Sequence, residues 1–213
     1  MKINQLFNFF IIALLLTSFI SCDQEGNSTQ EENTPKEVTA KEILGNPKYL
    51  AMSYGGYREK TREVQPTIEQ LKEDMKILSA MGVGIVRTYN VQLEQAENLL
   101  EAIHQLKEAD ATFEMYVMLG AWINCENAWT EKPNHDAEDI EGNTAEIARA
   151  VALANKYPDV VKVIAVGNEA MVKWAASYFV QPGIILKWVN HLQELKATDK
   201  LSKDIWITSS DNY

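Results

Sequence analysis

A single glutamate, Glu169, stands directly after a run of apolar residues, at a position where a carboxyl group can do acid chemistry. The run Val160 to Val166 predicts a buried strand, and Asn168 and Glu169 close it. The acid could simply stabilise a helix start, because the helix dipole favours negative charge there. Alternatively, a partly buried carboxyl group can protonate a leaving oxygen, such as that of a glycosidic bond. Asn168 would then hydrogen-bond a sugar hydroxyl near the reacting carbon.

Polar and aromatic residues follow the other predicted strands in the same way. Five apolar runs end in clusters of aromatic, amide or charged residues, at 54–58, 87–90, 122–124, 168–169 and 209–212. The carboxyl ends of parallel strands meet on one side of a sheet, and parallel barrels build their active sites there. Clusters at five strand ends in succession therefore predict a functional rim.

Strand and helix patterns alternate from about residue 47 onward. Apolar runs predict strands at 49–57, 83–90, 113–123, 160–170 and 205–210. Apolar residues at helical spacing predict the helices between them. Thr67 and Gln70 have the spacing of a capping box at the first of these helices, and Asn143 is the expected cap of the third, after a polar loop over 124–142.

This alternation predicts an α/β fold with a parallel sheet covered by helices. A doubly wound open sheet and a (β/α)8 barrel both fit the pattern. No glycine-rich phosphate loop follows any of the predicted strands, which disfavours a dinucleotide-binding fold.

Five runs together resemble glycoside hydrolase family 17, in the form found in Bacteroidetes lipoproteins: SYGGYR, VRTYN, YVMLGAW, VIAVGNEA and ITSSDN. The likeness covers residues 47–213. It implies a (β/α)8 TIM barrel, of which the chain supplies the first five strand–helix units, and a retaining hydrolase of β-1,3-glucans such as laminarin. It further implies that Glu169 is the catalytic acid/base and that Tyr54, Tyr89 and Asn168 line the subsite around the cut bond.

The resemblance also implies that the five units lack the catalytic nucleophile. A retaining mechanism needs a second carboxylate about 5 Å from the first, as the nucleophile. In this family it lies at the end of the seventh strand, so we expect it beyond Tyr213, in a longer protein. The chain by itself is then expected to be inactive. A transglucosidase with the same carboxylates and a non-catalytic glycan-binding lipoprotein remain alternatives.

Three tryptophans fall in or beside rim positions, where aromatic rings can stack on sugars. For Trp122, sugar contact and structural packing are both open. For Trp129 and Trp174, packing of the loop or of the helix start is favoured. The histidines show no metal-ligand spacing, so no metal or cofactor is expected.

The first residues resemble an export signal. Lys2 precedes an apolar segment at residues 6–21, and FISC, which ends in Cys22, resembles the lipobox of bacterial lipoproteins. The sequence thus predicts a signal peptide over 1–21 and lipidation of Cys22, with a plain secretory signal as the alternative.

The rest of the chain is expected to divide into a tether and a domain. Residues 22–46 are polar and are expected to be a disordered tether, followed by the glycosidase domain at 47–213. The expected location is the bacterial cell envelope, anchored by lipid to the outer membrane.

The charge of the chain restricts the kinds of molecule that it is expected to bind. The chain has 20 basic and 30 acidic residues and a formal net charge of -10. Nucleic acid is therefore disfavoured as a partner, because phosphates need Lys and Arg. An uncharged polysaccharide or oligosaccharide is compatible with this charge. With two cysteines, the chain has no disulfide framework.

Overall fold

The computed structural model describes residues 38–212. They belong to one compact unit. The predicted signal peptide, Cys22 and most of the predicted tether lie outside the described residues. Within them, no helix has the length and apolar character needed to cross a membrane.

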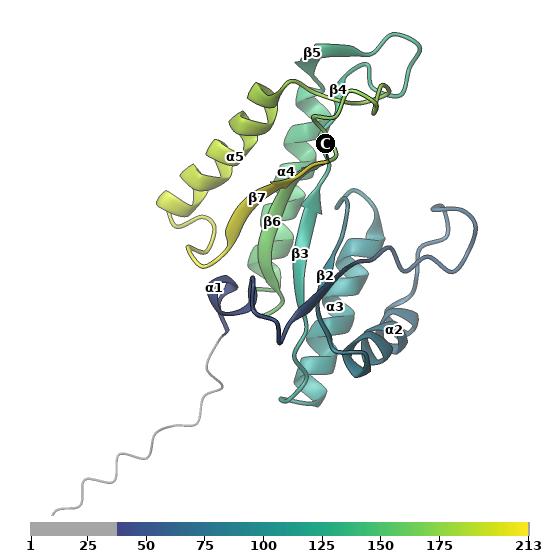
Figure 1. The fold of residues 1–213 in the computed structure, drawn as a ribbon, viewed down its shortest axis with the longest axis vertical. Helices are drawn as coiled ribbons and strands as arrows, with labels where there is room; N and C mark the ends of the chain where they lie inside the picture. The colour runs from purple at the N-terminus through teal and green to yellow at the C-terminus, as the bar shows by residue number, and fades with distance from the viewer. Residues whose placement is uncertain (1–37, 213) are drawn as a thin grey trace, which may run out of the picture. The chain divides into compact units, whose positions relative to one another are not determined.

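A five-stranded parallel sheet lies at the centre of the domain (Figure 1). Its strands are β1 (Leu50–Ser53), β2 (Val83–Arg87), β3 (Tyr116–Ala121), β6 (Val161–Asn168) and β7 (Trp206–Ser210). Each strand is hydrogen-bonded in parallel to the next one, in the order β1-β2-β3-β6-β7. The predicted α/β fold with a parallel sheet is confirmed.

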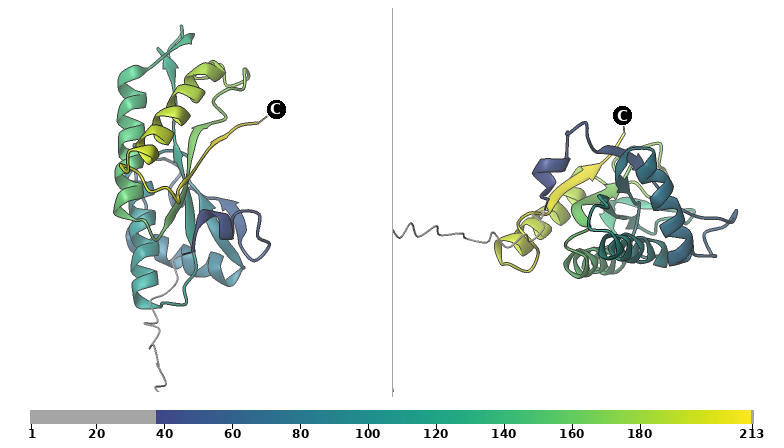
Figure 2. Two further views of the ribbon diagram at one scale, coloured as in Figure 1. Left: turned by 90° about the vertical axis from the view of Figure 1, so that its left-hand side faces the viewer. Right: turned by 90° about the horizontal axis from the view of Figure 1, so that it is seen from below.

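Four long helices follow the strands in turn (Figure 2). They share one hydrophobic core with the strands. They are α2 (Ile68–Ala80), α3 (Glu94–Ala109), α4 (Ile140–Lys156) and α5 (Pro182–Ala197). Leu71, Leu99, Ile147 and Leu192 place one residue of each helix in the cluster that also contains Ile164 of β6.

The other face of the sheet is covered differently. The short helix α1 (Ala40–Ile43) contributes Ile43, which packs with Ile85 and Tyr116 in a second cluster. A doubly wound sheet carries helices on both faces. Here the strand order follows the chain and the four long helices share one core, which is not the doubly wound arrangement.

Local signals explain where the helices begin. The predicted capping box of α2 is present, because Thr67 Oγ1 accepts a hydrogen bond from Gln70 N at 3.3 Å and Gln70 Oε1 accepts one from Thr67 N at 3.0 Å. The predicted cap of α4 is wrong. Asp139 caps this helix by accepting from Gly142 N at 2.9 Å, one turn before Asn143.

The polar segment before α4 contains secondary structure that its composition did not predict. Strands β4 (Cys125–Glu126) and β5 (Asn134–Glu138) pair there in a short antiparallel hairpin. Asn143, within α4, donates from Nδ2 to Asn124 O and accepts from Asn124 N at Oδ1, both at 2.9 Å. The side chain that could have capped the helix therefore holds the base of the hairpin.

Candidate active site

The carboxyl ends of the five strands lie on one side of the sheet. Ser53 at the end of β1 is paired with Arg87 at the end of β2. Ala121 at the end of β3 is paired with Val166 of β6. Asn168 is paired with Ser210 of β7. The polar clusters predicted at the strand ends are therefore brought to one rim.

Glu169 sits on an unusual backbone. Its φ is 48°, in the left-handed region, and Gly167 two residues earlier has a φ of 78°. The register of β6 against β7 shifts between Val166 and Asn168, and Glu169 N donates to Ser210 O at 2.8 Å. A left-handed non-glycine residue costs about 1–2 kcal/mol. Such residues persist where the surrounding structure holds them, and they concentrate at functional sites.

Arg87 connects two of the residues predicted to line the site. Its Nη2 donates to Asn168 Oδ1 at 2.5 Å, and its guanidinium carbon lies 5.3 Å from the centroid of the Tyr89 ring. Arg87 Nε is buried without a hydrogen-bond partner among residues 38–212. Tyr89, Arg87 and Asn168 therefore form one cluster next to Glu169, and the cluster retains an unused donor.

Tyr54 is bonded to Arg87 through its backbone and to α2 through its side chain, since Tyr54 N donates to Arg87 O at 2.9 Å. Its hydroxyl donates to Asp74 Oδ2 of α2 at 2.6 Å, and Arg58 Nη2 donates to Asp74 Oδ1 at 2.7 Å. Burial, followed by this hydrogen bond to Asp74, raises the pKa of Tyr54 well above its usual range, so the phenol stays protonated. The ring packs against the main core. The contacts of Tyr54 thus connect the end of β1 to α2.

Tyr54→Phe is expected to lower the free energy of unfolding by about 1–2 kcal/mol, because it removes a hydrogen bond to a charged acceptor. Urea denaturation of the wild type and the variant measures the change. Glucan affinity is expected to stay the same, whereas Tyr89→Ala should weaken it. If Tyr54→Phe weakened glucan binding and left stability unchanged, the Tyr54 hydroxyl would act on the sugar and not on the stability of the fold.

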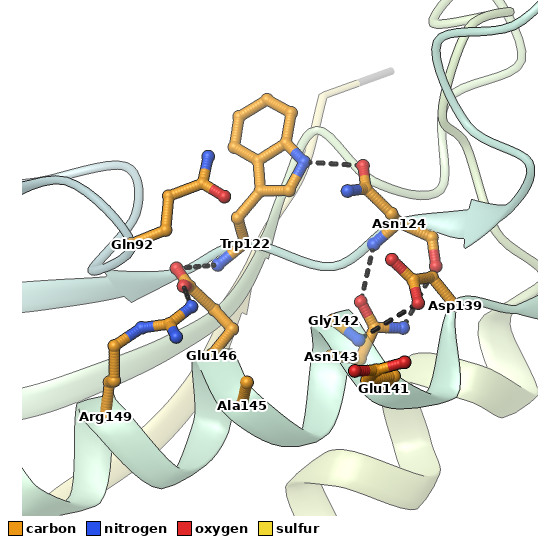
Figure 3. Close-up of a pocket in the computed structure, with 10 residues that line it drawn as sticks. All are labelled: Gln92, Trp122, Asn124, Asp139, Glu141, Gly142, Asn143, Ala145, Glu146 and Arg149. Atoms are coloured by element: carbon orange, nitrogen blue, oxygen red, sulfur yellow. Dashed lines mark hydrogen bonds and ion pairs between the residues drawn. The ribbon is translucent and has the colours of Figure 1, made fainter.

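Trp122 lies at the end of β3, beside a polar hollow of about 400 Å³ (Figure 3). Its indole Nε1 donates to Asn124 Oδ1 at 2.8 Å. Its ring centroid is 4.9 Å from that of Tyr178, which comes from the segment between β6 and α5. Trp122 is therefore joined to the strand end that carries Glu169.

Tyr178 was not among the residues predicted from the sequence. It is buried, and its hydroxyl reaches the backbone oxygen of Asn168 at 3.5 Å. Burial, and after it the negative charges of Glu169 and Asp211, raise the pKa of Tyr178. It lies in an irregular segment without periodicity, so no sequence pattern identified it.

A buried glutamate fixes two of the rim loops. Glu146 Oε1 accepts from Trp122 N at 3.0 Å, and Oε2 accepts from Arg149 Nη2 at 2.9 Å (Figure 3). Glu146 Oε1 also accepts from Val91 N at 2.7 Å. The side chain is only 4% exposed. One carboxylate of α4 thus joins the segments that follow β2 and β3. Within an amphipathic helix, sequence alone gives no reason to place this glutamate in the interior.

The described residues contain no cluster of side chains arranged as a metal site. In residues 38–212, no group of three or more His, Cys, Asp or Glu side chains is arranged to hold a metal ion. The acid and amide groups at the rim are suited to hydrogen bonding and proton transfer.

The fold and the site together define an α/β protein with a polar, aromatic rim and one strained glutamate. No protein-family profile and no curated protein matches the chain. Among solved structures, the chain is similar to an endo-laminarinase from Formosa Hel1_33_131, with 70% identity, a TM-score of 0.80, and coverage of 82% of this chain and 44% of that chain.

A distant likeness also appears, to CJP38, a beta-1,3-glucanase and allergen of Cryptomeria japonica pollen. Its identity is 16% and its TM-score 0.47, over 76% of this chain and 42% of that chain. The chain spans less than half the length of either solved protein.

Proposed function

We propose that this chain carries the acid/base half of a retaining glycoside hydrolase that acts on β-1,3-glucans such as laminarin. The observation that carries the proposal is the 70% identity to an endo-laminarinase over 82% of the chain. The rim supports it, because Glu169, Asn168 and aromatic rings gather at the carboxyl ends of parallel strands.

The proposed fold of the complete protein is a (β/α)8 barrel, and the proposed family is glycoside hydrolase family 17. Five parallel strands in chain order, with their four long helices sharing one core, are the first five units of a (β/α)8 barrel of glycoside hydrolase family 17. The coverage of 44% of the solved endo-laminarinase supports a longer protein in which further units close the barrel.

In the proposed mechanism, Glu169 protonates the glycosidic oxygen while a carboxylate nucleophile bonds to the anomeric carbon and the bond to the leaving sugar breaks. Glu169 then takes a proton from the water that displaces the nucleophile from that carbon. Asn168, held by Arg87, hydrogen-bonds a hydroxyl of the sugar being transferred. The nucleophile is assigned to no residue of this chain. Asp211 Oδ2 accepts a hydrogen bond from Met171 N at 3.0 Å, which is a structural contact.

We also propose that the protein is a lipoprotein of the outer membrane, with a signal peptide over 1–21, lipid on Cys22, a tether over 22–46 and the domain at 47–213. The support is the apolar segment that ends in FISC and the polar run after it.

The full-length product of the gene is expected to hydrolyse laminarin, measured as the release of new reducing ends. The 213-residue chain by itself should show none, because it supplies the acid and not the nucleophile. Cellulose, a β-1,4-glucan, is the matched control and should be left intact. Turnover of laminarin by the 213-residue chain would contradict the division of the two carboxylates.

The products distinguish the two other candidates. Oligosaccharides longer than the substrate would identify a transglucosidase. Binding of laminarin by the full-length product without any bond cleavage would identify a glycan-binding lipoprotein and would overturn the proposed hydrolysis.

A further inference from the structure

One amide side chain fixes two tryptophans at the rim. Asn124 Oδ1 accepts from the indole Nε1 of Trp122 at 2.8 Å and from that of Trp129 at 3.2 Å. The two ring centroids are 6.2 Å apart, with an interplanar angle of 31°. Asn124 Nδ2 has no hydrogen-bond partner among residues 38–212, so it remains free to donate. The amide thus orients two aromatic rings and presents a donor beside them.

Trp129 is held in place although it is largely exposed. Trp129 is 61% exposed, and its backbone has a left-handed φ of 65°. Trp129 N donates to Ser177 O at 2.8 Å, and Cys125 N donates to Tyr178 O at 3.2 Å. One face of its ring stacks on Tyr178, with centroids 5.0 Å apart at 24°. A ring that is exposed yet fixed by this many contacts is suited to receive a ligand, because little side-chain entropy is lost on binding.

The hairpin that carries Trp129 is also anchored at its far end. Glu138 of β5 accepts hydrogen bonds from Lys187, from Trp188 Nε1 at 2.7 Å and from Asn143 Nδ2 at 3.3 Å. Burial by itself would raise the pKa of Glu138, but these bonds outweigh it and the pKa is lowered. The carboxylate therefore stays charged at neutral pH and joins the hairpin to α4 and α5.

Tyr178 relates the two tryptophans to Glu169. Its ring lies between them and the end of β6, since it contacts both indoles and its hydroxyl reaches Asn168 O. The pair Trp122–Trp129 therefore lies one aromatic ring away from the strand end that carries the proposed acid.

The surroundings of the pair are polar and acidic. A hollow of about 400 Å³ borders Trp122 and a second, of about 610 Å³, borders Trp129, and both include Asn124 and Asp139. Glu141 adds a further acid to the first hollow and Glu126 to the second. Arg149, the basic residue of the first hollow, is paired with Glu146. Hydroxyl groups find acceptors in both hollows, whereas anionic sugars are repelled.

We propose that Trp122, Trp129 and Asn124 form a docking platform for uncharged sugar rings of the bound polysaccharide. The platform holds these rings next to the sugar whose glycosidic bond Glu169 protonates. The indole faces stack on the C–H faces of the sugar, and Asn124 Nδ2 donates to a hydroxyl. The acidic hollows select neutral glucan over uronate-containing chains. This inference rests on the proposed function and adds the residues that select and position the substrate.

The test is calorimetric titration of laminarihexaose into the full-length protein carrying Glu169→Gln, which keeps the ligand from being cut. Trp129→Ala and Asn124→Ala, each added to that background, are expected to raise Kd about tenfold, because each removes on the order of 1.4 kcal/mol of binding free energy. Trp174→Ala is the matched control, since Trp174 is also 61% exposed and also follows a rim strand. Its Kd should stay within about twofold of the background.

The outcomes distinguish the platform from the proposed function. If the hexaose binds and Trp129→Ala changes Kd no more than Trp174→Ala does, the platform is overturned while the proposed function stands. If only another uncharged hexaose binds, and Trp129→Ala weakens it, the platform stands and the β-1,3-glucan assignment falls. Equal binding of an oligoguluronate overturns the selection against charge. Binding of none of these sugars overturns both proposals. Circular dichroism of every variant verifies the fold.

Discussion

Glu169→Gln is expected to slow the hydrolysis of laminarin by the full-length protein about 10²–10⁴-fold, because the variant has no proton to give to the leaving oxygen. The amide has nearly the same size and keeps the hydrogen-bonding groups, so substrate affinity should change little. The initial rate of reducing-end release at saturating laminarin measures the effect. An aryl β-glucoside with an acidic phenol, which leaves without protonation, should lose much less rate in its bond-cleavage step.

The matched control for this variant is Glu131→Gln. Glu131 is an exposed glutamate of the segment between β4 and β5, outside both hollows. Its replacement makes the same chemical change away from the proposed substrate path and should keep kcat within about twofold. Equal losses in both variants, or a wild-type rate for Glu169→Gln on laminarin, would remove Glu169 from the acid role.

Glu146→Ala is expected to lower the free energy of unfolding by about 3–5 kcal/mol, the largest stability effect that we predict. The substitution leaves the backbone N–H groups of Val91 and Trp122 without their acceptor and Arg149 without its carboxylate. Losing one partner of a buried charged network costs more than the net contribution of the intact bonds, because the remaining groups stay desolvated. Urea denaturation of the purified chain measures the loss.

Two further variants separate hydrogen bonding from helix effects. Glu146→Gln keeps an oxygen for the two N–H groups and should lose about half as much as Glu146→Ala. Glu141→Ala makes the same truncation at an exposed position of the same helix and should stay within about 0.5 kcal/mol of the wild type. If Glu146→Ala were no worse than Glu141→Ala, the carboxylate would not hold the two loops.

The sequence predicts the sheet and the helices well because both carry strong periodic signals. The apolar runs at 160–170 and 113–123 enclose β6 and β3, and the capping box at Thr67 marks the start of α2. The first strand is less accurate, since 49–57 was expected and β1 ends at Ser53. The strand ends two residues before Gly55 and Gly56, in irregular backbone where Gly56 has a left-handed φ of 71°.

The site was predictable in part only. Position after a strand is a local signal, and it identifies Asn168, Glu169, Tyr89 and Trp122 as rim residues. Contacts between distant segments have no such signal. Trp129 stacks on Tyr178, which is 49 positions further along the chain (178 − 129). Glu146 can accept hydrogen bonds from two loop N–H groups only because α4 packs next to those loops. These interactions exist only once the sheet has brought the loops together.

The left-handed backbone of Glu169 also bears on how this position evolves. Glycine and asparagine adopt a φ of 48° more readily than glutamate does, so either would relax the local strain and favour stability. Random substitution in a chain under selection for folding alone would thus drift away from glutamate at position 169. A carboxylate on a backbone that disfavours it lowers the stability of the fold at this position, as strained residues of functional sites commonly do.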